Sequence, residues 1–208
     1  SICGTDLHIY NWDAWAQSAV KAPIVFGHEF TGEVVETGKN VTKVKRGDFV
    51  SVESHVPCGT CYQCTHGMMH ICDNLKILGV DRAGCFAEYV SVPALCAWKN
   101  SAGMPVEVAS IMEPMGNAVH AVSAAGVRGK QIAVFGCGPT GLFAIAVARA
   151  NDAARIVAVD INRKRLDLAR RVGAQVLHDG SDPEIVQKIV KESGGYGVDV
   201  TFEMSGSP

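Results

Sequence analysis

The sequence predicts an α/β protein in two parts, a β-rich first half followed by a doubly wound parallel sheet. Before about residue 110, short alternating runs of apolar and polar residues are separated by Gly, Asn and Pro, which is typical of short strands and turns. From Gln131 onward, continuous apolar runs alternate with helical stretches. That order is the one in which parallel strands are joined by helical crossovers.

The expected elements follow from these runs. In the first half, strands are predicted at residues 32–36, 48–52 and 86–92. In the second half, the predicted strands are 131–135, 155–160, 175–177 and 198–203, and the predicted helices are 142–150, 163–172 and 184–192. The change of pattern lies within residues 110–128, and we place the domain boundary there, giving domains of residues 1–118 and 119–208.

Composition excludes several classes of protein. A net charge of -2, with 19% charged residues of mixed sign, does not predict binding to nucleic acid. No apolar run is long enough for a membrane-spanning helix, and no secretory signal is apparent, so we expect a cytoplasmic protein with no membrane association. The chain starts at Ser1 without a leading strand and stops just after an apolar run. We therefore expect a fragment that lacks both ends.

Four cysteines stand within fifteen residues: Cys58, Cys61, Cys64 and Cys72. A tetrahedral zinc takes four soft ligands at about 2.3 Å, and Cys-x2-Cys steps wrap around such an ion. Two disulfides or four free thiols are the alternatives, which a cytoplasmic location disfavours. Four thiolates leave no open position, so this zinc would be structural. His66 and His70 are other possible ligands that we expect on the surface, and we expect packed thiols at Cys85, Cys96 and Cys137.

A second candidate metal group consists of Cys3, His28 and Glu29. Cys3 precedes a turn into a helical stretch, and His28 and Glu29 follow a short apolar run. Mixed sulfur, nitrogen and oxygen ligands suit a zinc that keeps an exchangeable position. Taken alone, His28 and Glu29 are better explained as a surface pair or as a core histidine with its partner than as metal ligands. They gain weight from the other motifs in the same chain.

Gly136, Gly138 and Gly141 form a Gly-x-Gly-x-x-Gly motif that follows a predicted strand and opens a helix. Asp160 ends the next strand, which is the context of a dinucleotide-binding loop. The glycines allow a pyrophosphate to approach the helix N-terminus, and Asp160 favours NAD over NADP by binding ribose hydroxyls. A nearby cation is able to accommodate a 2′-phosphate instead, and three are present: Arg163, Lys164 and Arg165.

Together these motifs resemble the medium-chain zinc-dependent alcohol dehydrogenase family. The resemblance extends over residues 1–208 and rests on Cys3 to Asp6, Gly27 to Glu29, the four cysteines and the glycine motif, in family order. It implies a GroES-like β-barrel catalytic domain joined to a Rossmann domain. It also implies that the first barrel strands and the second half of the Rossmann sheet are missing here, and that the protein is a homodimer or homotetramer.

Within the family, the chain is most similar to the branch that oxidises L-threonine. Residues Cys3 to Trp15 and Glu113 to His120 carry this similarity. Glu113 stands where the alcohol dehydrogenases place a second cysteine ligand, and the threonine and polyol branches have an acid there. The resemblance therefore implies zinc ligation by Cys3, His28 and Glu29, with Glu113 acting directly or through water.

The same resemblance implies roles for five further residues. Thr5 and His8, on one face of a helical turn, would relay the substrate's proton to solvent. His55 matches a substrate-pocket position, and Thr140 and Arg165 match further NAD contacts. The expected reaction is the oxidation of L-threonine to 2-amino-3-oxobutanoate with reduction of NAD. The alternatives are a polyol or vicinal-diol dehydrogenase, and a non-catalytic relic that keeps its zinc and NAD sites.

Overall fold

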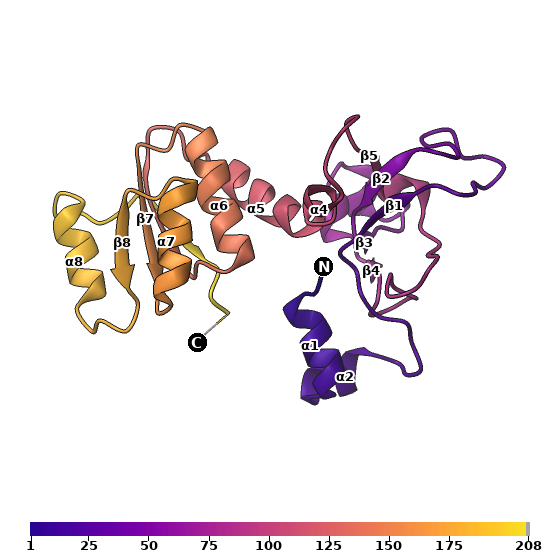
Figure 1. Ribbon diagram of the computed structural model, residues 1–208, viewed down its shortest axis with the longest axis horizontal. Coiled ribbons are helices and arrows are strands. Elements are labelled where there is room, and N and C mark those ends of the chain that lie inside the picture. Colours follow the sequence, from indigo (N-terminus) through magenta and orange to yellow (C-terminus); the bar gives the residue numbers. More distant parts are fainter. Residues whose placement is uncertain (207–208) are drawn as a thin grey trace. The chain divides into compact units, whose positions relative to one another are not determined.

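The structure, a computed structural model, describes residues 1–206 (Figure 1). The chain divides into two compact units, Ser1–Glu113 and a second that begins at Pro114. Helix α5 (Met112–Ala125) begins in the first unit and continues into the second, and the predicted boundary after residue 118 lies within this helix. No helix among residues 1–206 has both the length and the apolar character needed to cross a membrane.

The first unit combines two small antiparallel sheets with short helices. One sheet has the strand order β1-β2-β5 and the other pairs β3 with β4. The strands are β1 (Thr31–Glu33), β2 (Phe49–Val52), β3 (His55–Val56), β4 (Lys76–Ile77) and β5 (Ala97–Lys99). The helices are α1 (Gly4–Asn11), α2 (Ala14–Ala19), α3 (Tyr62–Thr65) and α4 (Val106–Ala109), with 3-10 turns η1 (Met69–Ile71) and η2 (Ala94–Cys96). Buried valines of β2 and Leu78 form part of its apolar core.

Residues 86–92, all within the described part of the chain, form bends and irregular backbone, so the strand predicted there is wrong. Within residues 1–206, its one backbone hydrogen bond to a distant segment is at its start, where the Phe86 N–H donates to the Phe26 carbonyl at 3.0 Å. The Ala87 N–H then turns back to the Cys85 carbonyl at 2.7 Å. The alternation of apolar residues therefore predicted a strand, but the backbone hydrogen bonds of a strand do not continue beyond Phe86.

A close backbone contact fixes the segment that leads into His28. Gly27 has a φ of +91°, and a Cβ there would lie 2.5 Å from the Phe86 ring. A Cβ on Gly84 would lie 2.2 Å from the Gly27 carbonyl oxygen. Only glycine permits both the positive φ and this approach. The Phe26 and Phe86 rings pack edge to face across the same contact, with centroids 5.1 Å apart.

The second unit is a parallel four-stranded sheet with helices on both faces. Its strand order is β8-β7-β6-β9, from β8 (Val176–Asp179), β7 (Arg155–Asp160), β6 (Gln131–Phe135) and β9 (Val200–Glu203). The helices are α6 (Pro139–Ala150), α7 (Arg163–Val172) and α8 (Ile185–Glu192). The predicted doubly wound sheet is thus confirmed. Helix α6 begins at Pro139 rather than at Leu142, since proline is favourable in a first helical turn.

Alternate residues of the central strands point to opposite faces and build two apolar layers. Ile132 and Val134 pack with buried residues of α5, α6 and α7, whereas Ala133 packs with Ile189 of α8. Figure 1 shows α8 and the α6–α7 pair on different sides of this sheet. The glycine motif follows β6, which lies between β7 and β9, at the point where the strand order reverses. Ligands of open α/β sheets bind at such a point.

Candidate active site and metal centres

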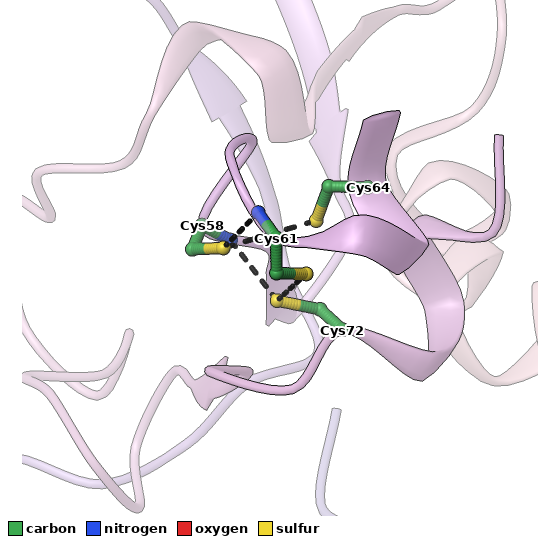
Figure 2. Close-up of side chains that lie close together, drawn as sticks. All are labelled: Cys58, Cys61, Cys64 and Cys72. Atoms are coloured by element: carbon green, nitrogen blue, oxygen red, sulfur yellow. Dashed lines mark hydrogen bonds between the residues drawn. The ribbon is translucent and has the colours of Figure 1, made fainter. Parts of the chain in front are cut away.

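The four cysteines of the cysteine loop, residues 58–72, converge on one point (Figure 2). The Sγ atoms of Cys58 and Cys64 lie 4.0 Å apart, and those of Cys61 and Cys72 lie 3.8 Å apart. Four sulfurs at about 2.3 Å from a tetrahedral zinc are separated from one another by about 3.8 Å. All four thiols are free, and their separations are far beyond the about 2.05 Å of a disulfide bond. The donors and their spacing fit zinc.

Backbone N–H groups of the loop donate hydrogen bonds to two of the sulfur atoms, those of Cys72 and Cys58. Cys72 Sγ accepts from the Cys58 N–H at 3.2 Å and from the Asn74 N–H at 3.3 Å. Hydrogen bonds from Thr60, and then from the Cys61 N–H, lower the pKa of Cys58 to about 5 in the metal-free loop. Burial raises the pKa of Cys64 to about 12. One thiol is therefore a thiolate at neutral pH before any metal arrives, and thiolate is the form that binds zinc.

The other sulfur and imidazole groups near this loop lie outside the four-sulfur group. His66 and His70 are exposed, and the His66 ring stacks on Tyr62 with centroids 4.0 Å apart. Cys96 and Cys137 are buried and Cys85 is half-buried. These positions agree with the surface histidines and packed thiols that the sequence predicts.

The second group brings together Cys3, His28 and Glu29, whose ligand atoms all lie within 4.8 Å of one another. Cys3 precedes α1 as its N-cap, and His28 and Glu29 are buried in the segment that follows Gly27. The His28 imidazole beside the Cys3 thiol lowers the pKa of Cys3, and Cys3 in turn raises the pKa of His28. One sulfur, one nitrogen and one oxygen donor in this arrangement fit a zinc that retains an open position.

Asp6, which the sequence analysis did not single out, lies behind this group. Its Oδ1 atom is 3.7 Å from His28 Nδ1, and both atoms are buried without a hydrogen-bond partner among the described residues. The other oxygen, Oδ2, accepts from the Cys3 N–H at 2.8 Å. A small movement of either side chain would form a carboxylate–histidine pair, the arrangement that orients a metal-binding imidazole. The sequence did carry a signal for Asp6, because this acid follows the candidate ligand Cys3 by three residues at the start of a helix.

Thr5 and His8 both lie on α1, at different depths. Thr5 is half-buried, with its Oγ1 atom 3.8 Å from Cys3 Sγ. His8 is exposed, its Nδ1 atom is hydrogen-bonded to the Asp13 carboxylate, and its ring lies against Trp15. The two predicted relay residues therefore run from the Cys3 group towards solvent.

A third group was not predicted as a unit. Glu53, His55 and Glu113 place their ligand atoms within 4.8 Å of one another. His55 Nδ1 lies 2.7 Å from Glu53 Oε1 and 4.0 Å from Glu113 Oε1. The buried Ser54 hydroxyl donates to Glu113 Oε1 at 2.5 Å, while burial raises the pKa of Glu113. Glu113 thus lies with His55, and the sequence analysis missed Glu53 and Ser54. The Glu-x-His spacing was the signal, because alternate residues of an extended chain share a face.

The glycine motif forms a turn from β6 into α6. Gly136 has a φ of +90°, and a Cβ there would lie 2.5 Å from the backbone nitrogen of Ser205. A Cβ on Gly141 would lie 1.9 Å from the Gly136 carbonyl oxygen. Gly138 differs, since a Cβ there meets nothing within 4 Å. The fold requires the first and third glycines, whereas open space at Gly138, the N-cap of α6, fits the approach of a pyrophosphate.

Asp160 is buried at the end of β7, beside this turn. Its Oδ2 accepts from the Cys137 N–H and its Oδ1 from the Asn162 N–H, both at 2.7 Å. Arg165 Nη1 lies 3.9 Å from Asp160 Oδ2, and the Arg165 side chain is half exposed. Thr140 is half-buried in the first turn of α6. The predicted cofactor-binding residues are thus grouped around the C-terminal ends of β6 and β7: the glycine motif, Asp160, Thr140 and Arg165.

Comparison with known proteins agrees with this arrangement. Residues 1–102 match the alcohol dehydrogenase GroES-like domain, and residues 139–208 match the zinc-binding dehydrogenase domain. An L-threonine 3-dehydrogenase of Bacillus licheniformis is 54% identical over 208 residues, which cover 100% of this chain and 60% of that protein. The chain therefore spans about three-fifths of the length of this relative.

Two solved structures share the fold. A protein of Sinorhizobium meliloti 1021, described as a zinc-binding dehydrogenase bound to NADP, has a TM-score of 0.89 and 32% identity, over 99% of this chain and 60% of that one. Galactitol-1-phosphate dehydrogenase of Escherichia coli has a TM-score of 0.86 and 31% identity, over 99% and 58%. With both domain models matched in order along one chain, this protein belongs to the zinc-dependent alcohol dehydrogenase family, built from a GroES-like and a Rossmann domain.

Proposed function

We propose that the complete protein oxidises the secondary alcohol of L-threonine to 2-amino-3-oxobutanoate and reduces NAD. The observation that carries this proposal is the 54% identity, over all 208 residues, to a protein named L-threonine 3-dehydrogenase. The grouping of Cys3, His28 and Glu29 supports it, because a dehydrogenase of this family needs a metal with an open position.

The residues of the first unit have distinct tasks in this proposal. Cys3, His28 and Glu29 hold a zinc ion, which when bound supplies a Lewis acid that lowers the pKa of the substrate hydroxyl. The Thr5 hydroxyl accepts the proton and His8 passes it to solvent, with Asp13 holding the His8 ring. Glu113 and His55 line the same region, from which they contact the rest of the substrate. The cysteine loop holds a second zinc that does no chemistry.

The residues of the second unit bind the cofactor. NAD supplies the hydride acceptor, and the protein supplies its orientation. Gly138 and the N-terminus of α6 receive the pyrophosphate, while Asp160 accepts hydrogen bonds from the ribose hydroxyls. The relative from S. meliloti is bound to NADP. In this chain a buried carboxylate at the end of β7 repels a 2′-phosphate, so we assign NAD, with Arg165 closing one side of the pocket.

A polyol or vicinal-diol dehydrogenase is the second candidate. The structural similarity to galactitol-1-phosphate dehydrogenase favours it, since the two chains share the fold at 31% identity. The identity to the B. licheniformis protein is higher, at 54%, so threonine is the preferred substrate.

Steady-state kinetics of the zinc-loaded, full-length protein test the substrate and the cofactor together. We expect NADH formation with L-threonine at a kcat/KM at least tenfold above that with 2,3-butanediol or sorbitol, and a preference for NAD over NADP. A higher kcat/KM with either polyol contradicts the threonine assignment. Metal analysis separates an enzyme from a protein that keeps only the structural zinc shell, because we expect two zinc ions per chain and the shell alone would hold one.

We further infer that the protein is cytoplasmic and assembles as a homodimer or homotetramer. The family resemblance supports the assembly, and the ordinary charge and composition of the chain support the location. Light scattering of the full-length protein tests the oligomeric state, and a monomeric mass would contradict it.

A further inference from the structure

We propose that Glu53 is a positioning residue that holds the His55 ring and, through it, selects substrates with an α-amino acid head group. This inference deepens the proposed threonine oxidation and rests on it. Neither the predicted site nor the domain matches assign a role to Glu53.

One carboxylate oxygen of Glu53 accepts two hydrogen bonds from the same histidine. The His55 backbone N–H donates to Glu53 Oε1 at 2.9 Å and His55 Nδ1 lies 2.7 Å from that atom. The His55 backbone is itself held in β3, where it pairs with Ile77. An imidazole χ2 angle has a broad, roughly two-fold preference, so the ring has no strong orientation of its own. The double hydrogen bond fixes which nitrogen faces Glu53.

This orientation decides which nitrogen is left for a ligand. Glu53 Oε1, the Ser54 hydroxyl at 3.3 Å and Glu113 Oε1 at 4.0 Å all lie near Nδ1. Nε2 is separated from Nδ1 by Cε1, and it points in a different direction from the ring. A carboxylate only accepts hydrogen bonds, so Glu53 keeps a proton on Nδ1. Nε2 is therefore the nitrogen through which His55 meets a substrate.

The chemistry of Nε2 matches an amino acid head group in either charge state of the ring. In the neutral ring, Nε2 carries a lone pair that accepts from an ammonium group. In the protonated ring, Nε2–H donates to a carboxylate. L-Threonine has both groups, whereas 2,3-butanediol has neither and offers the same kind of secondary alcohol. We therefore expect loss of the Glu53 contact to weaken the binding of L-threonine and to leave that of 2,3-butanediol nearly unchanged.

Kinetics on Glu53→Ala and Glu53→Gln in the full-length, zinc-loaded protein test the selectivity. For Glu53→Ala we expect kcat/KM for L-threonine to fall about tenfold, mainly through KM, with less than a twofold change for 2,3-butanediol. Glu53→Gln keeps an acceptor oxygen and should recover part of the loss. An equal fall for both substrates would show a merely structural role and would overturn the proposal.

A double-mutant cycle with His55→Ala shows whether Glu53 acts through His55. In the His55→Ala background, Glu53→Ala should cause no further loss with L-threonine. If the two losses multiply, Glu53 acts independently of His55 and the positioning role is wrong. Glu192→Ala is the matched control, because Glu192 makes the same kind of contact to His178, at 3.0 Å, in the second unit. This control variant should leave unchanged the ratio of kcat/KM for L-threonine to kcat/KM for 2,3-butanediol.

Nitrogen NMR of the histidine rings tests the positioning without turnover. His55, assigned by its loss in His55→Ala, should show a protonated Nδ1 that persists in Glu192→Ala and is lost or averaged in Glu53→Ala. Unchanged His55 shifts in Glu53→Ala would overturn the positioning role. If the wild-type protein fails to oxidise L-threonine while the shifts change as expected, the positioning holds, and the proposed substrate and the selectivity for it fall.

Discussion

The two metal groups differ in what surrounds each ligand atom. In the cysteine loop, Cys58 is exposed and its thiolate is stabilised by neighbouring N–H and O–H donors. In the Cys3 group, His28 and Glu29 are buried, and Asp6 backs the imidazole. Four sulfurs complete a shell, whereas one sulfur, one nitrogen and one oxygen leave a position for a substrate oxygen. The difference in ligands therefore predicts different consequences of losing one of them.

Replacement of Cys3 by serine should abolish catalysis without unfolding the protein. A serine hydroxyl is protonated at neutral pH and binds zinc far less well than a thiolate, so we expect zinc content to fall from two ions to one per chain. We expect kcat to fall by a factor of about 100 or more. Metal analysis measures the zinc content and steady-state kinetics measures kcat. The control is Cys85→Ala, because Cys85 is a half-buried thiol outside both zinc groups. Full turnover in the serine variant would remove Cys3 from the mechanism.

The order in which the metal-free cysteine loop is alkylated should follow the pKa values of its thiols. Hydrogen bonding lowers the pKa of Cys58 to about 5, whereas burial raises that of Cys64 to about 12. Thiolate is the reactive form, so Cys58 should react first with iodoacetamide at pH 7 and Cys64 much later. Peptide mass spectrometry after chelation measures the order. Zinc-loaded protein should be protected at both positions, and faster labelling of Cys64 would contradict the assignment.

At the scale of the elements, the glycine turn contains one glycine that the fold requires, Gly136, and one that we expect only the cofactor to require, Gly138. Gly136→Ala forces a side chain into a positive φ and towards Ser205, so both stability and NAD affinity should fall. In Gly138→Ala the added Cβ meets no neighbouring atom. Alanine is a poorer N-cap than glycine, but it also reduces the conformational entropy of the unfolded chain, and the two effects offset each other.

For Gly138→Ala we therefore expect a free energy of unfolding within about 1 kcal/mol of wild type and an NAD affinity about tenfold weaker. Thermal unfolding and titration calorimetry measure the two quantities. If Gly138→Ala binds NAD normally, the pyrophosphate does not approach the turn at this residue.

The elements of the second unit could be predicted from the sequence because each is specified locally. Runs such as residues 131–135 are buried on both faces and so are apolar throughout, and β6 has those bounds. In the first unit, the hydrogen bonds at Phe86 depend on a segment some sixty residues earlier, which alternation cannot reveal. The Glu-x-His spacing could have indicated Glu53 as a partner of His55, but only the fold brings Glu113 close to that pair.

At the scale of the whole molecule, each compact unit carries the residues for its own ligand. Both candidate zinc groups lie in Ser1–Glu113, and the glycine turn with Asp160 lies in the second unit. A ligand that binds only the folded form stabilises the part of the protein that holds it.

Hydrogen exchange should therefore respond to zinc and to NAD in different places. Chelation is expected to increase exchange around residues 3–6, 28–29 and 58–72 while leaving β6 and β7 protected. Addition of NAD should slow exchange at residues 136–142, and mass spectrometry of the full-length protein measures both. Loss of protection throughout the second unit on chelation would show that the zinc groups also support the parallel sheet.

The two backbone hydrogen bonds to Asp160 have a consequence for redesign. The carboxylate to which we assign the preference for NAD also accepts hydrogen bonds from the Cys137 and Asn162 N–H groups, and so stabilises the turn. An engineer who replaces Asp160 with alanine to admit NADP would remove the charge repulsion and, in the same step, leave two backbone N–H groups without their acceptor, one of them buried. Asparagine or serine at this position retains an acceptor oxygen, whereas alanine does not. Changes of cofactor in this lineage should therefore pass through small polar residues.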